Sequence, residues 1–226
     1  MNSKAIREMK VVVINGSPRK NFNTATLLQR AIDGIEQAGG EVQYENLYEY
    51  DFTGCRSCFA CKVKGSKTNG LCAIRDGIRP LLEACLQADA LLFGSPIYYD
   101  NISGMMRSFL ERLWYPLDAN KMDENRRPVK ILNRTIPVGF IYTMNCPEWL
   151  REQIYSHLFN SMQNRMMAFF GSYEPLFSCD TYQFKDYSKY DANMFDEKKK
   201  AEQREKQFPI DCQKAFQLGV KLVKGK

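Results

Sequence analysis

The stretch that decides the fold is residues 11–24, which read VVVINGSPRKNFNT. It begins as an unbroken run of apolar, mostly β-branched residues, the pattern of a strand that is covered on both faces. The run passes through Gly16, Ser17 and Pro18, which are typical of tight turns, into a segment with helical periodicity. The start of that helix has backbone N–H groups without intrahelical partners and the positive end of the helix dipole. We therefore predict an anion site at this loop.

The residues of the loop narrow the kind of anion. Neither the G-x-x-x-x-G-K-[ST] pattern of a P-loop nor the G-x-G-x-x-G pattern of a dinucleotide fold is present, so we expect a monophosphate. Ser17, Asn23 and Thr24 offer short hydrogen-bond donors, and Arg19 offers a guanidinium. The alternative is a plain tight turn in which Asn23 and Thr24 only cap the helix.

Two further loops follow hydrophobic strands in the same way. Residues 90–104 read ALLFGSPIYYDNISG, and residues 143–147 read TMNCP. Tyr98 and Tyr99 in the second loop suit packing against a flat aromatic ligand, although one tyrosine could simply cover the core. A monophosphate at the first loop and a planar ring at the second together describe FMN.

The whole chain alternates between strand and helix patterns. Strands are predicted over residues 10–15, 41–47, 90–94, 136–143 and 173–178, and helices over residues 24–38, 78–88, 103–114, 148–170 and 209–223. This order indicates an α/β fold with a doubly wound, mostly parallel sheet of about five strands and helices on both faces. In such sheets the ligand lies beyond the carboxyl ends of the strands, where all three loops are expected.

Length and composition set the broad class. The 226 residues suit a single domain, 1–226, and no stretch approaches the roughly 18 apolar residues of a membrane span. Residues 1–10 lack the apolar core of a signal peptide, so we expect a cytoplasmic protein. A formal charge of +6 suits an anionic cofactor better than nucleic acid. The charged run 197–206 is expected to be a solvated helix face.

A family resemblance is carried by residues 16–24, by residues 95–98 and by the intervening CRSCFAC of residues 55–61. With these segments the sequence resembles the flavodoxin-like, NAD(P)H-dependent FMN reductase and iron–sulfur flavoprotein family. The resemblance implies a flavodoxin-like five-stranded sheet of order 2-1-3-4-5, noncovalently bound FMN and, frequently, a homodimer in which the partner helps to wall the flavin. The residues that it assigns to the FMN phosphate are Ser17, Arg19, Asn23, Thr24 and Ala25. Those that it assigns to the isoalloxazine ring are Pro96, Ile97, Tyr98, Asn101 and Ser103. Thr143 and Met144 match the family by position only.

The cysteine segment departs from the family pattern. Cys55, Cys58 and Cys61 have the spacing of iron–sulfur ligands. In cluster-bearing relatives the fourth cysteine follows within a few residues, whereas here residues 62–71 intervene before Cys72. We therefore favour free thiols over a [4Fe-4S] cluster, and a redox-active or zinc role is a further alternative.

These observations predict an FMN-dependent oxidoreductase that accepts hydride from NAD(P)H and passes electrons to a small-molecule or protein acceptor, with no side chain acting as acid or base. The alternatives are an electron carrier of the flavodoxin or iron–sulfur flavoprotein type and a non-catalytic flavin- or nucleotide-binding protein. Two insertions, residues 116–134 and 179–195, are expected to border the active site. In the first, Lys121, Arg126 and Arg127 would meet the dinucleotide phosphates or form a solvated loop.

Overall fold

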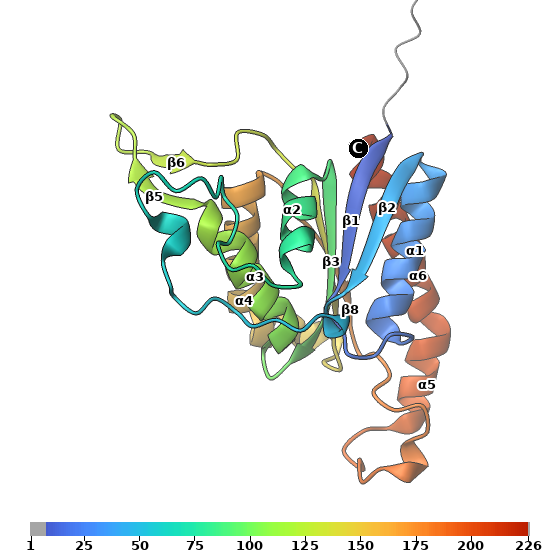
Figure 1. Cartoon of the computed structure of the whole chain (residues 1–226). Coiled ribbons are helices and arrows are strands. Elements are labelled where there is room, and N and C mark those ends of the chain that lie inside the picture. Colours follow the sequence, from blue (N-terminus) through green and yellow to red (C-terminus); the bar gives the residue numbers. More distant parts are fainter. Residues whose placement is uncertain (1–7, 226) are drawn as a thin grey trace, which may run out of the picture.

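Five parallel strands form the centre of the computed structural model, which describes residues 8–225 (Figure 1). Their order across the sheet is β2-β1-β3-β7-β8. The flavodoxin-like α/β fold is confirmed. Counted among themselves, the parallel strands have the order 2-1-3-4-5, but the predicted five-stranded sheet matches only in part, because a sixth strand, β4 (Asn101–Ile102), pairs with β3. The bounds of the five parallel strands are β1 Met9–Asn15, β2 Gly40–Asn46, β3 Ala90–Tyr98, β7 Val138–Thr143 and β8 Glu174–Ser178.

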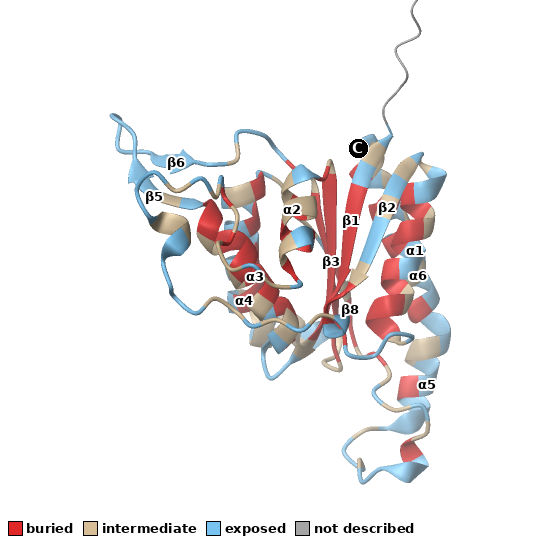
Figure 2. Ribbon diagram, in the orientation of Figure 1, coloured by how far each residue is buried: buried red, intermediate tan, exposed pale blue. Residues whose placement is uncertain are grey.

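Helices cover both faces of this sheet. α1 (Asn23–Gln37) and α6 (Phe208–Lys224) lie on one face, and α2 (Arg79–Gln87), α3 (Gly104–Leu117) and α4 (Glu148–Phe170) lie on the other (Figure 1). Because side chains alternate along a strand, β1 sends residues to two separate apolar clusters, one on each face. The central strands are therefore buried over most of their length (Figure 2). Among residues 8–225 no helix combines the length and the apolar character needed to cross a bilayer.

Glycine allows α1 and α6 to approach closely. A Cβ atom added to Gly34 would lie 2.1 Å from the carbonyl oxygen of Phe216, and one added to Gly219 would lie 2.0 Å from that of Ala31. No side chain fits at such distances, so the backbones of the two helices touch at both glycines. This contact packs the C-terminal half of α1 against α6.

The structure also contains short elements that the sequence did not predict. β4 (Asn101–Ile102) pairs antiparallel with the end of β3 through a turn in which Tyr99 and Asp100 have φ values of 44° and 64°. β5 (Asp118–Met122) and β6 (Pro128–Lys130) form a separate hairpin. The single-turn helices are η1 (Leu47–Glu49), η2 (Ala60–Lys62) and η3 (Tyr187–Lys189). The helix predicted over residues 197–206 is present as α5 (Glu197–Lys206), which precedes α6.

The two insertions lie at opposite ends of the sheet. Residues 179–195 follow β8 directly and begin at the carboxyl ends of the strands. Residues 116–134 instead follow α3, which runs back toward the amino ends, and Arg134 donates hydrogen bonds to the carbonyls of Leu86 and Ala88 just before β3 (Figure 1). The expectation that residues 116–134 border the flavin site of their own chain is therefore wrong, because α3 ends far from the carboxyl edge of the sheet and these residues follow it there.

Candidate flavin site

The first two predicted loops are fastened together at the carboxyl edge of the sheet. The N–H of Gly16 donates to the carbonyl of Gly94 at 2.8 Å, and the hydroxyl of Ser103 donates to the carbonyl of Gly16 at 2.5 Å. Ser103 also caps α3 by accepting the N–H of Met106. The start of α1 and the start of α3 thus face one common edge.

The start of α1 presents the donors expected of a phosphate cradle. The residue before the helix, Phe22, is extended and makes no side-chain hydrogen bond to the first turn, and the first turn contains no acidic residue. The first intrahelical bond runs from Thr26 to the carbonyl of Phe22, so the amides of Asn23, Thr24 and Ala25 are left for other acceptors. All three of these residues are buried. Uncapped amides beside the positive helix end fit the phosphate of FMN.

The side chains predicted to hold the phosphate divide into two groups. Ser17 is buried and its hydroxyl accepts the N–H of Arg19 within the loop, while Thr24 reaches the hydroxyl of Thr143 at 2.7 Å. Arg19 and Asn23 instead turn toward residues 182–183. The Arg19 guanidinium donates to the carbonyl of Gln183 and stacks 3.9 Å from the Phe22 ring. The Asn23 amide donates to the carbonyl of Tyr182 at 2.7 Å.

The second loop offers an exposed surface on a fixed base. Pro96 and Ser103 are buried, and the N–H of Ser103 donates to the Ser95 hydroxyl at 2.9 Å. Ile97 is half-buried, and Tyr98 and Asn101 are exposed. The β3–β4 turn therefore holds a partly apolar surface at the carboxyl edge, where a planar ring can rest.

The third loop contributes one residue to the site and one to the core. Thr143 lies at the end of β7 beside Thr24. The Met144 side chain is part of the apolar cluster under α2, α3 and α4, and its backbone bonds to Ser178 and Thr181. Met144 therefore supports the loop and does not face the cradle.

Two tyrosines near the loops were missed by the sequence reasoning. The Asn15 amide donates to the hydroxyl of Tyr44 at 3.0 Å. Burial raises the pKa of Tyr48, the nearby Tyr98 raises it further, and a hydrogen bond with Ser103 opposes both. The second strand was predicted to end at Leu47, so Tyr44 and Tyr48 stand at or next to its carboxyl end. That position was the signal that these tyrosines lie near the site.

The cysteine segment does not form a cluster cage in this arrangement. Cys55, Cys58, Cys61 and Cys72 line one small cavity of about 10 Å³, which is room for about one water molecule. Within residues 8–225 no three His, Cys, Asp or Glu side chains are placed to hold a metal ion. The four thiols thus line one common cavity, which is small in this arrangement.

Cys72 is instead part of a buried arginine network. Arg112 on α3 donates from Nε to Cys72 Sγ at 2.9 Å and pairs through both terminal nitrogens with the Asp76 carboxylate. It also donates to the carbonyl of Thr53, so one buried guanidinium ties both ends of the cysteine segment to α3. Burial lowers the Arg112 pKa, but the hydrogen bonds that Arg112 donates to Asp76 and Cys72, together with the charges of these two groups, outweigh it, so the pKa is raised.

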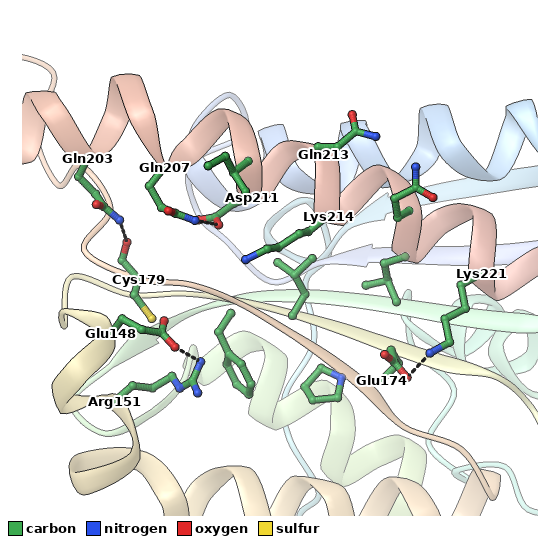
Figure 3. A pocket seen from close by; sticks show the side chains of 16 residues that line it. Glu148, Arg151, Glu174, Cys179, Gln203, Gln207, Asp211, Gln213, Lys214 and Lys221 are labelled. Atoms are coloured by element: carbon green, nitrogen blue, oxygen red, sulfur yellow. Dashed lines mark hydrogen bonds and ion pairs between the residues drawn. The ribbon is translucent and has the colours of Figure 1, made fainter. Parts of the chain in front are cut away.

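A larger cleft lies elsewhere, along the edge strand β8 between α4 and α6 (Figure 3). Its volume is about 830 Å³, and none of the residues predicted for the flavin lines it. Several of its polar groups satisfy one another: Arg151 pairs with Glu148 at 2.8 Å and Lys221 with Glu174 at 2.9 Å. The buried Asp211 carboxylate accepts hydrogen bonds from Ser178 and Gln207.

Comparison with known proteins places the chain among flavoproteins. It is 35% identical over 104 residues to an iron–sulfur flavoprotein of Archaeoglobus fulgidus, a match that covers 46% of this chain and 48% of that protein. It is 27% identical over 104 residues to a putative NAD(P)H-dependent FMN-containing oxidoreductase of Bacillus subtilis, covering 46% of this chain and 51% of the relative. The matches span about half the length of these curated relatives.

The fold is shared with solved structures along nearly the whole chain. An NAD(P)H:quinone oxidoreductase from Methanothermobacter marburgensis superposes with a TM-score of 0.65 at 15% identity, covering 96% of this chain and 98% of that one. An azoreductase from Bacillus anthracis gives a TM-score of 0.64 at 15% identity, with coverage of 94% and 99%. The family model for NADPH-dependent FMN reductase matches residues 9–141, more than half of the sequence. The chain therefore belongs to the NADPH-dependent FMN reductase family.

Proposed function

We propose that this protein is an FMN-dependent oxidoreductase that accepts hydride from NADH or NADPH and passes the electrons to a small-molecule or protein acceptor. The observation that carries the proposal is the uncapped, buried start of α1, which lies beside the β3–β4 turn. A phosphate at the start of α1 and a flat ring on the β3–β4 turn match the two ends of FMN.

In this proposal bound FMN supplies the redox chemistry, and the chain supplies binding and orientation. The amides of Asn23, Thr24 and Ala25, with Ser17 and Arg19, hold the phosphate. Ile97, Tyr98 and Asn101 support the ring, while Pro96, Ser103 and Thr143 fix the loops that carry these groups. No side chain is required to act as a general acid or base.

The remaining features follow from the same proposal. We expect residues 1–226 to work as one domain in the cytoplasm, as a homodimer whose second copy helps to wall the flavin. The family membership and the resemblance to quinone reductases and azoreductases in fold support this picture. We expect neither nucleic acid nor a membrane surface as a partner.

The test combines flavin analysis with one pair of variants. Purified protein should show the two-banded flavin absorbance, release FMN on denaturation and oxidise NADH or NADPH in the presence of an artificial acceptor. Ala25→Asp places a carboxylate at the start of α1, where it suits the helix dipole but repels a phosphate. Because residue 25 is buried, far-UV circular dichroism checks that the variant is folded, and the folded variant should lose FMN.

Gln29→Asp is the matched control, because it makes the same charge change on the exposed part of the same helix. It should retain the flavin. Loss of FMN in both variants, or in neither, would remove the start of α1 from the binding site. A protein that binds FMN but never oxidises either nicotinamide contradicts the reductase activity.

A second candidate function is an electron carrier of the iron–sulfur flavoprotein type. It is favoured by the four cysteines that line one cavity and by the names of several relatives. Under this alternative, anaerobically purified protein contains iron and exchanges single electrons with a protein partner. Iron content and the rate of flavin reduction by NAD(P)H separate the two candidates.

A further inference from the structure

The segment after β8 closes one side of the phosphate loop. We call residues 180–204 the strap. Its first residues run along the third loop, where the N–H of Asp180 donates to the carbonyl of Cys146 and that of Thr181 to the carbonyl of Met144. The strap then crosses to the start of α1, where the carbonyls of Tyr182 and Gln183 accept the side chains of Asn23 and Arg19.

Both the nitrogen and the oxygen of the Asn23 side-chain amide form hydrogen bonds with the strap. Its Nδ2 donates to Tyr182 at 2.7 Å, and its Oδ1 accepts from Arg204 on α5 at 3.1 Å. Asn23 is buried, so this side chain has no freedom to turn toward a ligand without breaking a buried hydrogen bond. The side chain of Asn23 thus fastens the strap, while its backbone amide faces the cradle.

Other contacts make the strap a fixed wall. Lys200 is buried and binds the Asn145 side chain, the Asn145 carbonyl and the Asp180 carboxylate. The N–H of Gln183 donates to the hydroxyl of the buried Tyr187, whose ring packs against Tyr182 and Phe184. The run of charge in α5 is therefore not only a solvated face, since Lys200 and Arg204 anchor the strap from it.

The position of this wall relative to the two loops has a consequence for the ligand. The phosphate loop is bonded to the β3–β4 turn on one side, through Gly16 and Ser103, and to the strap on the other, through Arg19 and Asn23. A flavin whose ring rests on the β3–β4 turn and whose phosphate reaches α1 ends at the strap. There the backbone of Tyr182 and Gln183, which is bonded to Asn23 and Arg19, blocks any further extension of the ligand past its first phosphate.

We propose that the strap makes this site selective for flavin monophosphate over flavin dinucleotide, with Asn23 and Arg204 as the residues that hold it in place. The inference rests on the proposed FMN function. FMN ends in one phosphate and fits between α1 and the strap. FAD continues into a second phosphate and an adenosine, and it fits only if the strap moves away.

The test measures FMN and FAD affinities of flavin-free protein by quenching of flavin fluorescence. Arg204→Met keeps the packing against Phe208 and removes the donor to Asn23, and Tyr187→Phe removes the hydroxyl that holds Gln183. Lys206→Met is the control, because it makes the same charge change at an exposed position of α5. Backbone hydrogen exchange over residues 182–195 reports how far each variant loosens the strap.

We expect wild-type protein to bind FMN at least about 100-fold more tightly than FAD. Arg204→Met and Tyr187→Phe should each narrow that ratio about tenfold or more, chiefly because they bind FAD more tightly than wild type does. Lys206→Met should match wild type. An unchanged ratio in both strap variants and in their combination overturns the inference, as does equal binding of FMN and FAD by wild type. Wild-type protein that binds neither flavin contradicts the proposed function itself.

Discussion

The hydroxyl oxygens of Thr24 and Thr143 lie 2.7 Å apart, and both side chains are buried. The contact joins the first turn of α1 to the end of β7, across 119 residues of sequence. Each hydroxyl gives the other a hydrogen-bond partner at the edge of the phosphate cradle. Because a buried hydroxyl without a partner is costly, the pair holds the cradle and the third loop in register.

This pair predicts a non-additive effect on stability. Thr143→Val keeps the shape of the side chain but leaves the Thr24 hydroxyl without its partner, so we expect flavin-free protein to lose about 1–3 kcal/mol. The double variant Thr24→Val with Thr143→Val removes both hydroxyls and should cost less than the sum of the single changes. Urea unfolding of the four proteins measures the coupling, and strictly additive losses would show that the two hydroxyls act independently.

Arg19 is expected to contribute to FMN binding through its charge. Its guanidinium donates one hydrogen bond to the carbonyl of Gln183, and a guanidinium has five N–H donors in all. Arg19→Ala should weaken the binding of FMN by about 1–3 kcal/mol, the usual size of a charge-assisted hydrogen bond. The neighbouring Lys20→Ala, which loses only an exposed pair with Glu49, serves as control in the same titration. Unchanged affinity in Arg19→Ala would remove Arg19 from the site.

The sequence pattern predicted the five strands and the loops because each depends on local pattern, whereas the order of the strands was implied by the family resemblance. The apolar run before Gly16 and the turn residues after it are enough to place a strand, a loop and a helix start. The β3–β4 turn was missed because Tyr99 and Asp100 occupy positions with positive φ that usually call for glycine or asparagine. No pattern in residues 116–134 indicated their hairpin or the end of the sheet at which it lies.

The candidate site was predictable in kind but not in orientation. Local motif matching identified Asn23 as a donor beside the phosphate, but its side chain is taken by Tyr182, 159 residues away. Likewise, the spacing of charges in residues 197–206 predicted a solvated helix, and Lys200 is buried because Asp180 and Asn145 pair with it. Such pairings arise from tertiary contacts, which a single sequence does not encode at any fixed spacing.

The α1–α6 contact predicts a steric limit on Gly219. Gly219→Ala places a Cβ atom 2.0 Å from the carbonyl oxygen of Ala31, so the helices have to separate. We expect a loss of at least about 1–3 kcal/mol in urea unfolding, the cost of overpacking a close contact. Gly77→Ala is the control, because nothing lies within 4 Å of an added Cβ there. Equal stability of the two variants would contradict the close approach of α1 and α6.

We predict that the protein carries no iron–sulfur cluster on Cys55, Cys58, Cys61 and Cys72. Three lysines lie in the long gap before Cys72, and Cys72 Sγ is hydrogen-bonded to Arg112. Elemental analysis of anaerobically purified protein should find substoichiometric iron. Four irons per chain, with a broad absorbance that bleaches on reduction, would show that the segment rearranges around a cluster and would favour the electron-carrier function.

The last prediction concerns kinetics: NAD(P)H and the electron acceptor should use one pocket in turn. One face of the flavin would rest on the β3–β4 turn, with Tyr98 beside it, which leaves one open face for a planar substrate. Residues 116–134 of the same chain do not enclose that face, since they lie at the other end of the sheet. Two planar substrates cannot stack on one face together, so NAD(P)H oxidation has to be complete before the acceptor enters.

Initial-rate plots at several acceptor concentrations should therefore run parallel, with the first product leaving before the second substrate binds. A stopped-flow experiment without acceptor isolates the first half of the cycle, and NADH or NADPH should reduce the flavin there at a rate that accounts for turnover. Intersecting plots would mean that both substrates bind at once, which requires a second pocket. Failure of both nicotinamides to reduce the flavin would remove the reductase function and leave the electron carrier, because the fold and the phosphate cradle serve either role.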